Sequence, residues 1–219
     1  MAIISFKHNF IFVKTAKTGG TSIEIELSKR LEEDAIVTPI WPPIRGHKPR
    51  NFQRPGGDFL THMSARRIKE YLGEKVFNRM FKFCFEREPV AKCLSHFHML
   101  RNSPYHNNLG SYRKTWAQYC DDKDFPIDTD KYSEIKDGVP SKIVDVVFPY
   151  EKLNSSLRQV TEMLKIPGFK LEATAKSEFS KKRILTINDV EQKQRDTIYN
   201  AFEHSLLVSG LKEYYCRGM

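Results

Sequence analysis

The stretch FIFVKTAKTGGTSIEIEL, residues 10–27, decides the fold that the sequence predicts. Its first four residues are a continuous apolar run, which is typical of a parallel strand buried on both faces. After the turn KTGGTS, residues 17–22, Ile23 and Leu27 recur one helical turn apart, while Glu24 takes the other side. This spacing indicates an amphipathic helix, so the stretch predicts a strand, a tight turn and a helix in succession.

Two more segments repeat the order of strand and helix. FKFCF, residues 81–85, predicts a second strand, and Pro89 suits the first turn of the helix behind it. VDVVF, residues 144–148, predicts a third strand before another helical pattern, and a final helix is expected to start near Asn188 or Asp189. Alternating strands and helices predict an α/β fold, a three-layer sandwich whose central parallel sheet binds ligands beyond the carboxyl ends of its strands.

A length of 219 residues fits a single domain, residues 1–219, that carries two insertions. The first, residues 41–58, is rich in proline, glycine and basic residues, and the second, residues 101–140, is polar with scattered aromatic residues. The basic residues of the first either attract an anionic acceptor or are simply solvated: Arg45, Lys48, Arg50 and Arg54. The aromatic residues of the second either stack on a sugar ring or hold the insertion together: Tyr105, Tyr112 and Trp116.

The composition limits the classes of partner. The chain has 36 Lys and Arg against 27 Asp and Glu, a net charge of +9, which favours an anionic partner such as a nucleotide, a sulfated glycan, nucleic acid or a membrane surface. No apolar run reaches the length of about 18 residues that a membrane span needs, and the first residues lack the pattern of a secretory signal. We therefore expect a cytoplasmic protein without a membrane anchor. The sequence carries no signal of the oligomeric state.

The turn after the first predicted strand has the chemistry of an anion site. The start of a helix presents unpaired backbone N–H groups and partial positive charge, which together bind phosphate or sulfate. The residues of this turn add a full charge, close backbone approach and hydroxyl donors: Lys17, Thr18, Gly19, Gly20, Thr21 and Ser22. The ATP-binding pattern G-x-x-x-x-G-K-[ST] is absent because the lysine precedes the glycines. The alternative is that the two glycines serve only the turn.

A second anion site is predicted at the same edge of the sheet. Arg87 follows the second strand directly, and Ser95 lies about two turns into the next helix, so both can face one anion near the helix start. Two oxyanion sites at one edge suggest a nucleotide that carries phosphates at two positions.

These two segments resemble a known family. VKTAKTGGTSIE, residues 13–24, resembles the 5′-phosphosulfate-binding loop of the sulfotransferases that use 3′-phosphoadenosine 5′-phosphosulfate, and FEREPVAKCLSHF, residues 85–97, resembles their 3′-phosphate-binding strand and helix. The likeness is closest to the carbohydrate-type branch, which includes heparan sulfate 2-O-sulfotransferases and short bacterial relatives. Two positions depart from the pattern: Ala16 stands where proline is common, and Glu88 replaces the more usual Asp or Asn.

The resemblance implies a donor, a fold and a set of contacts. The donor is 3′-phosphoadenosine 5′-phosphosulfate, its product is adenosine 3′,5′-bisphosphate, no metal is needed, and the nucleotide-binding topology is P-loop-like. Lys17 is implied to contact the bridging oxygen of the phosphosulfate, with residues 18–22 around the 5′ end. Arg87 and Ser95 are implied on the 3′-phosphate. Lys181 and Arg183 lie where relatives close a loop over the nucleotide.

The family also implies a base that takes a proton from the acceptor hydroxyl, often a histidine between the two motifs. His62, in FLTHMSARRIKEYLG, fits that pattern, and an imidazole suits such work at neutral pH. The alternative interpretation of His62 is a capping or packing residue before the following helix, and His47 is a rival base. Metal binding by Cys93, His96 and His98 is less expected than a core thiol beside two surface imidazoles.

We therefore expect a sulfotransferase that moves a sulfuryl group to a hydroxyl of an acceptor, in the first place a glycan or glycoconjugate and not a nucleic acid. Two other interpretations remain open. A P-loop-like nucleotide kinase would bind ATP with magnesium, and a non-catalytic module for polyanions or nucleic acid would bind with steep salt dependence and without preference for a 3′-phosphate. The sequence does not identify the acceptor.

Overall fold

The central sheet has five strands in the order β3-β1-β2-β4-β7. The computed structural model describes residues 2–44, 46–55, 57–107, 110–172 and 184–216. The strands of the central sheet are β1 Ala2–Ser5, β2 Phe10–Val13, β3 Ile36–Val37, β4 Phe81–Glu86 and β7 Val146–Pro149. Four of the five run in one direction, because only β1 is antiparallel to its neighbours.

The predicted parallel core is present in β2, β4 and β7, which pair in parallel. The sequence analysis did not foresee β1, which forms an antiparallel hairpin with β2. Asn9 closes this hairpin with a left-handed backbone at φ 51°, a conformation that asparagine tolerates better than most residues. The protein is thus a mixed α/β fold with a mostly parallel sheet.

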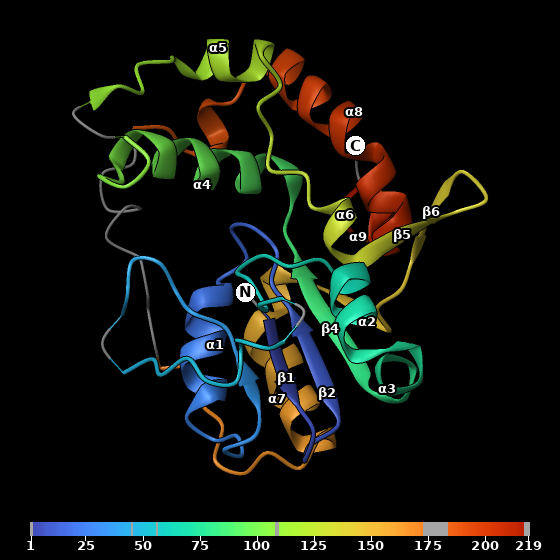
Figure 1. Ribbon diagram of the computed structural model, residues 1–219. Coiled ribbons are helices and arrows are strands. Elements are labelled where there is room, and N and C mark those ends of the chain that lie inside the picture. The colour runs from blue at the N-terminus through green and yellow to red at the C-terminus, as the bar shows by residue number, and fades with distance from the viewer. Residues whose placement is uncertain (1, 45, 56, 108–109, 173–183, 217–219) are drawn as a thin grey trace.

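Helices lie on both sides of the sheet and beyond its carboxyl edge (Figure 1). They are α1 Gly20–Ser28, α2 Ala65–Leu72, α3 Glu74–Arg79, α4 Pro89–Asn102, α5 Trp116–Asp121, α6 Thr129–Tyr132, α7 Leu153–Met163, α8 Gln192–Ser209 and α9 Lys212–Cys216. A hairpin of β5 Ser133–Lys136 and β6 Val139–Lys142 projects from the body. None of the helices in the described ranges is long and apolar enough to cross a membrane.

Two apolar clusters fill the space on the two faces of the sheet. Successive residues of β2 alternate between them, since Phe10 and Phe12 join one cluster and Ile11 and Val13 the other. The first cluster holds α1 and α7 against the sheet, and the second holds α2, α3, α4 and α8. The continuous apolar run of β2 is therefore buried on both faces, as its sequence predicts.

The starts of two helices test the capping predictions. Pro89 begins α4 as expected, and the Glu88 side chain caps that helix by accepting from the amides of Val90 at 3.0 Å and Ala91 at 2.6 Å. The prediction for the last helix is wrong by a few residues, because α8 begins at Gln192. The Asp189 carboxylate instead accepts from the backbone N and hydroxyl of Thr186, each at 2.7 Å, and closes a separate 3₁₀ turn.

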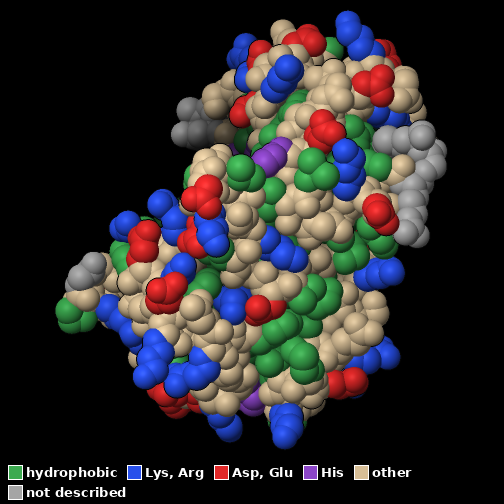
Figure 2. Space-filling view, turned by 90° about the vertical axis from the view of Figure 1, so that its right-hand side faces the viewer, with side chains coloured by type: hydrophobic (Ala, Val, Ile, Leu, Met, Phe, Trp, Pro, Cys, Tyr) green, Lys and Arg blue, Asp and Glu red, His purple; other side chains and the backbone are tan. Residues whose placement is uncertain are grey.

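The net charge of +9 is not gathered into one basic surface on the face that Figure 2 shows. Lys and Arg side chains there lie interspersed with Asp and Glu. Lys69 of α2, for example, lies 3.4 Å from a carboxylate oxygen of Glu74 and 3.3 Å from one of Glu134. This face therefore offers no continuous basic track to a polyanion.

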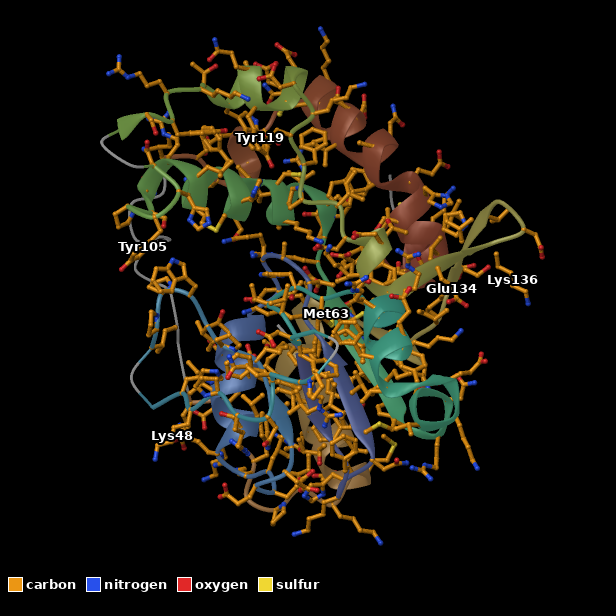
Figure 3. The ribbon with its side chains drawn as sticks, viewed as in Figure 1. Lys48, Met63, Tyr105, Tyr119, Glu134 and Lys136 are labelled. Atoms are coloured by element: carbon orange, nitrogen blue, oxygen red, sulfur yellow. The ribbon has the colours of Figure 1, made fainter. Side chains whose placement is uncertain are left out.

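The insertion at residues 101–140 is held together by its aromatic residues. Trp116 stacks on Tyr119 at a centroid distance of 5.3 Å, and both pack on Phe97 of α4. Tyr112 also packs on Phe97, whereas Tyr105 is 56% exposed. Figure 3 shows Tyr119 directed from α5 toward α4 and Tyr105 beyond the end of that helix. Trp116 and Tyr112 are thus packing residues, whereas the packing does not involve the exposed side of Tyr105.

The insertion at residues 41–58 contains one arginine with a structural task. The guanidinium of Arg50 donates to the carbonyl oxygens of Ser28, Leu31 and Glu32 at 3.1 to 3.2 Å, where α1 ends. A cation at that end also complements the helix dipole. Arg54 lies over the ring of Phe59, 5.6 Å from its centroid. Lys48 is exposed, and Arg45 lies outside the described residues.

A buried polar network fixes α1 to the strands beneath it. Glu24, expected on the solvent side of α1, is instead fully buried, because the whole helix is covered. Its carboxylate lies 3.7 Å from Lys14 Nζ and accepts from the Thr38 hydroxyl at 3.4 Å. Lys14 Nζ also donates to the Thr21 hydroxyl at 2.7 Å. Burial raises the pKa of Glu24 to about 8, against the opposing effects of Lys14 and Thr38.

Replacing Glu24 by Gln should change how stability depends on pH. The folded protein keeps a proton on Glu24 up to about pH 8, whereas the unfolded chain loses it near 4.5. The stability that this proton contributes is complete below the unfolded pKa and is lost as the pH rises through the folded pKa. Relative to the wild type, Glu24→Gln should therefore gain about 1 kcal/mol or more between about pH 5 and pH 8. Urea unfolding at both pH values measures this, with the exposed Glu33→Gln as control, and parallel curves for wild type and Glu24→Gln would contradict it.

Candidate anion-binding site

Three parallel strands end at the same edge of the sheet and bring three segments together. Residues 14–19 follow β2, Arg87 follows β4, and Tyr150 follows β7. A Cβ atom on Gly19 would meet the ring of Tyr150 at 3.4 Å, and the Arg87 guanidinium lies 4.7 Å from the centroid of the same ring. The two segments predicted to bind anions therefore lie next to each other at one edge of the sheet.

Residues 14–19, which we call the anion loop, have a backbone that few side chains allow. Lys17 and Gly19 both adopt the left-handed conformation, with φ of 62° and 69°. Gly20 begins α1, and a Cβ atom there would approach Lys14 Cγ to 2.5 Å, so this position must be glycine. No side chain caps α1, all of which lies in the described part of the chain. The helix start therefore faces the loop with its own N–H groups.

The two lysines of the opening sequence have different positions. Lys14 is 7% exposed and reaches inward to Thr21 and Glu24. Lys17 is half-buried at the turn itself, and its carbonyl oxygen accepts from Arg87 Nη1 at 3.3 Å. Lys17 is thus the lysine at the turn, where the sequence predicts an anion contact, while Lys14 lies beneath the start of α1.

The hydroxyl groups of Thr18 and Thr21 already make hydrogen bonds within the protein, which the sequence does not indicate. Thr18 is buried, and its hydroxyl lies 2.9 Å from that of Thr15, which in turn donates to the carbonyl of Phe85 in β4. The Thr21 hydroxyl accepts from Lys14, which leaves its own proton for another acceptor. Ser22 is 8% exposed at the first turn of α1. The side chain of Thr18 therefore braces the loop.

A cluster of buried charges lies behind the anion loop. Lys92 of α4 is 0% exposed, and its Nζ contacts Glu86 Oε1 at 2.5 Å and Asp128 Oδ2 at 2.8 Å. The same Asp128 oxygen accepts from the backbone N of Ala16 at 2.7 Å. Burial raises the pKa of Glu86, although the Lys92 charge acts in the opposite direction. The cluster links the loop to the insertion at residues 101–140.

Both candidate histidines lie beside Lys14. Part of the surface of His62 is open to solvent, although neighbouring atoms crowd its ring, and it makes a hydrogen bond to the backbone of Lys14. His47 Nε2 lies 3.0 Å from the carbonyl oxygen of Thr38. Burial lowers the pKa of His62 to about 3 and that of His47 below its usual value, and the charge of Lys14 adds to both effects, so His62 is a weaker base than the free imidazole expected from the sequence. Both imidazoles are therefore neutral at pH 7. The cap of α2 is Ser64, which accepts from Arg67 N, so His62 is not the capping residue.

A third histidine also lies near the anion loop. Burial and then the charge of Lys17 lower the pKa of His96 to about 4, and its Nδ1 lies 3.0 Å from the hydroxyl of Tyr119. His98 is only 4% exposed and pairs with the carbonyl of Leu185, so the expectation of a surface imidazole is wrong for it. Cys93 is a buried thiol as expected. The described residues contain no cluster of three or more groups that could hold a metal.

The remaining predicted site residues divide into two groups. Ser95 is half-buried on α4, the helix that starts next to Arg87. Lys181 and Arg183 lie outside the described residues. The sequence analysis missed Tyr150 and Asp128. Tyr150 could have been found, because it follows a predicted strand directly, whereas nothing near Asp128 in the sequence points to the loop 112 residues away.

The comparisons with known proteins reveal a similarity to an archaeal protein. No model of a protein family matches the chain, and no solved structure matches it. An uncharacterized protein of Archaeoglobus fulgidus is 31% identical over 109 residues, a match that covers 48% of this chain and 84% of the archaeal protein. The chain therefore belongs to the same family as this uncharacterized archaeal protein.

Proposed function

We propose that the protein is a cytoplasmic sulfotransferase that moves a sulfuryl group from 3′-phosphoadenosine 5′-phosphosulfate to a hydroxyl of an acceptor, in the first place a carbohydrate. The observation that carries this proposal is the meeting of Lys17 and Arg87 at the carboxyl ends of β2 and β4, with Arg87 Nη1 3.3 Å from the Lys17 carbonyl. The P-loop-like topology is part of the same proposal.

The site suits a nucleotide with phosphates at both ends of its ribose. The start of α1 and the charge of Lys17 can hold the 5′ group, since N–H groups and a cation favour a tetrahedral oxyanion. Arg87 directly follows β4 and Ser95 belongs to α4, the strand and helix next to the anion loop, and we assign both to the 3′-phosphate. The ring of Tyr150 supports both halves through Gly19 and Arg87.

The chemistry needs a base and a charge stabiliser. The bound donor supplies the sulfuryl group. His62 takes the proton of the acceptor hydroxyl while the acceptor oxygen forms its bond to sulfur, and the electron pair of the breaking S–O bond leaves with the 5′-phosphate. Lys17 and the first N–H groups of α1 stabilise the charge on the leaving oxygen. The bond of His62 to the Lys14 backbone fixes the ring, which leaves its other nitrogen to accept the proton.

The two other interpretations receive less support. A kinase of the P-loop type would carry lysine after the glycines of the loop, and here the order is reversed. A polyanion-binding module is motivated by the net charge of +9, but basic and acidic side chains alternate on the face in Figure 2. Neither alternative explains the pairing of Lys17 with Arg87 at one edge.

Calorimetric titration without metal tests the donor site first. Adenosine 3′,5′-bisphosphate should bind tightly, and adenosine 5′-monophosphate should bind at least about tenfold more weakly because it lacks the group that Arg87 holds. Arg87→Ala should remove this difference, whereas Arg66→Ala, in an exposed pair with Glu70 on α2, should not. Binding of magnesium ATP in place of the bisphosphate would favour the kinase, and equal, salt-sensitive binding of all three would favour the polyanion module.

Replacing Lys17 by Ala should reduce turnover far more than donor binding. Removal of a group that stabilises transition-state charge typically costs about a hundredfold to a thousandfold in kcat. The measurement is release of labelled sulfate to an acceptor found by a screen, beside calorimetric affinity for the bisphosphate. Lys212→Ala, in an exposed pair with Glu203, is the control. Unchanged turnover would remove Lys17 from the mechanism.

Both His62 and His47 lie near Lys14, so single variants are needed to decide which of the two is the base. His62→Asn should lower kcat by about a hundredfold or more, whereas His47→Asn should retain most activity. Since the pKa of free His62 lies below its usual 6.5, kcat/KM of the wild type should show no loss from its protonation between about pH 7 and pH 8. The reverse order of the two variants would make His47 the base, and an acid limb near pH 7 would contradict a lowered pKa.

A further inference from the structure

The backbone of Lys17 needs support from outside the anion loop. A left-handed φ of 62° is unfavourable for a residue with a side chain, and it persists only where the surroundings hold it. Two hydrogen bonds flank this residue: Ala16 N donates to Asp128 Oδ2 at 2.7 Å, and the Lys17 carbonyl accepts from Arg87 at 3.3 Å. The first of these contacts comes from the insertion at residues 101–140.

Asp128 is held rigidly for this task. It is 5% exposed just before α6, and the oxygen that accepts from Ala16 also accepts from Lys92 at 2.8 Å. Lys92 is itself fixed by Glu86, whose Oε1 accepts in addition from the backbone N of Arg87 at 3.0 Å. A buried carboxylate with charged and neutral donors on one oxygen has little freedom to move, because each donor restricts it.

We infer that Asp128 is a positioning residue, through which the insertion holds the anion loop in the shape that receives the 5′ end of the nucleotide. This inference rests on the proposed function. Asp128 does not touch the ligand; it orients the peptide before Lys17, so the lysine and the helix start point to one anion. Its negative charge is opposed by Lys92, which limits repulsion of that anion. The insertion thereby contributes to the donor site through Asp128.

The effect of Asp128 should be confined to the 5′ subsite. The bond between Glu86 and the backbone of Arg87 does not involve Asp128, so the 3′ subsite keeps its support when Asp128 is replaced. Adenosine 3′-monophosphate and adenosine 3′,5′-bisphosphate therefore distinguish local positioning from general damage to the fold, because they differ only in the group that the anion loop holds.

The experiment compares wild type, Asp128→Ala, Asp128→Asn and the control Asp130→Asn. Asp130 lies two residues away, is exposed and pairs only with Lys131 among the ion pairs of the described residues. In Asp128→Ala, affinity for the bisphosphate should fall about tenfold or more, with a change below about twofold for the 3′-monophosphate. Asp128→Asn keeps an oxygen acceptor for Ala16 and should recover part of the loss. Asp130→Asn should match the wild type.

Amide hydrogen exchange at Ala16, measured by NMR without ligand, separates this inference from the proposed function. Exchange should speed up about tenfold or more in Asp128→Ala and not in Asp130→Asn. If the wild type binds no nucleotide, the proposed function fails, yet faster exchange would still establish the support of the loop. Unchanged exchange, a gain in bisphosphate affinity, or an equal loss for both nucleotides would overturn the inference. If Asp128→Ala does not fold, the same comparisons apply to Asp128→Asn.

Discussion

The parallel pairing of β2, β4 and β7 is the constraint on which the rest of the site depends. Parallel strands end at the same edge, so segments that are far apart in the chain meet there without any specific attraction between them. The anion loop, Arg87 and Tyr150 come from positions spread over more than half of the chain, yet the Arg87 guanidinium lies over the Tyr150 ring, and a Cβ atom on Gly19 would meet the same ring. The pairing of the strands brings the segments together, and side-chain contacts such as that of Arg87 with Tyr150 then fix their detailed positions.

Buried lysines fix the anion loop from two sides. Lys14 lies below the start of α1 with Glu24, and Lys92 lies behind the loop with Glu86 and Asp128. Burying a charge costs several kcal/mol unless a partner offsets it, so such groups are weak evidence for stability. They are better understood as a source of fixed geometry, because a buried ion keeps its partners at one distance and angle. A loop with two left-handed residues needs that kind of support.

The elements that could be predicted from the sequence were those with a local signal. The apolar runs of β2, β4 and β7 and the glycines of the turn specify their own conformations, and Pro89 marks the start of α4. The exposure of Glu24 was predicted wrongly, because the helical spacing of residues cannot show that a later segment of the chain, which includes Thr38, covers that side of α1. Asp128 was missed for the same reason: its partner is Ala16, and no pattern along the chain records a contact across the fold. The sequence thus predicts the conformation of a short segment, but not its burial by segments that are distant in the chain.

The position of Thr18 shows how function is divided within one turn. Hydroxyl groups beside an anion loop suggest ligand contacts, but Thr18 and Thr15 bond to each other, and Thr15 reaches the carbonyl of Phe85 in the next strand. Lys14 Nζ likewise donates a hydrogen bond to the Thr21 hydroxyl. Most polar side chains of the turn therefore hold the backbone. Under the proposed function, the backbone N–H groups at the start of α1 would then meet the anion as fixed dipoles, which stabilise developing charge without reorganisation.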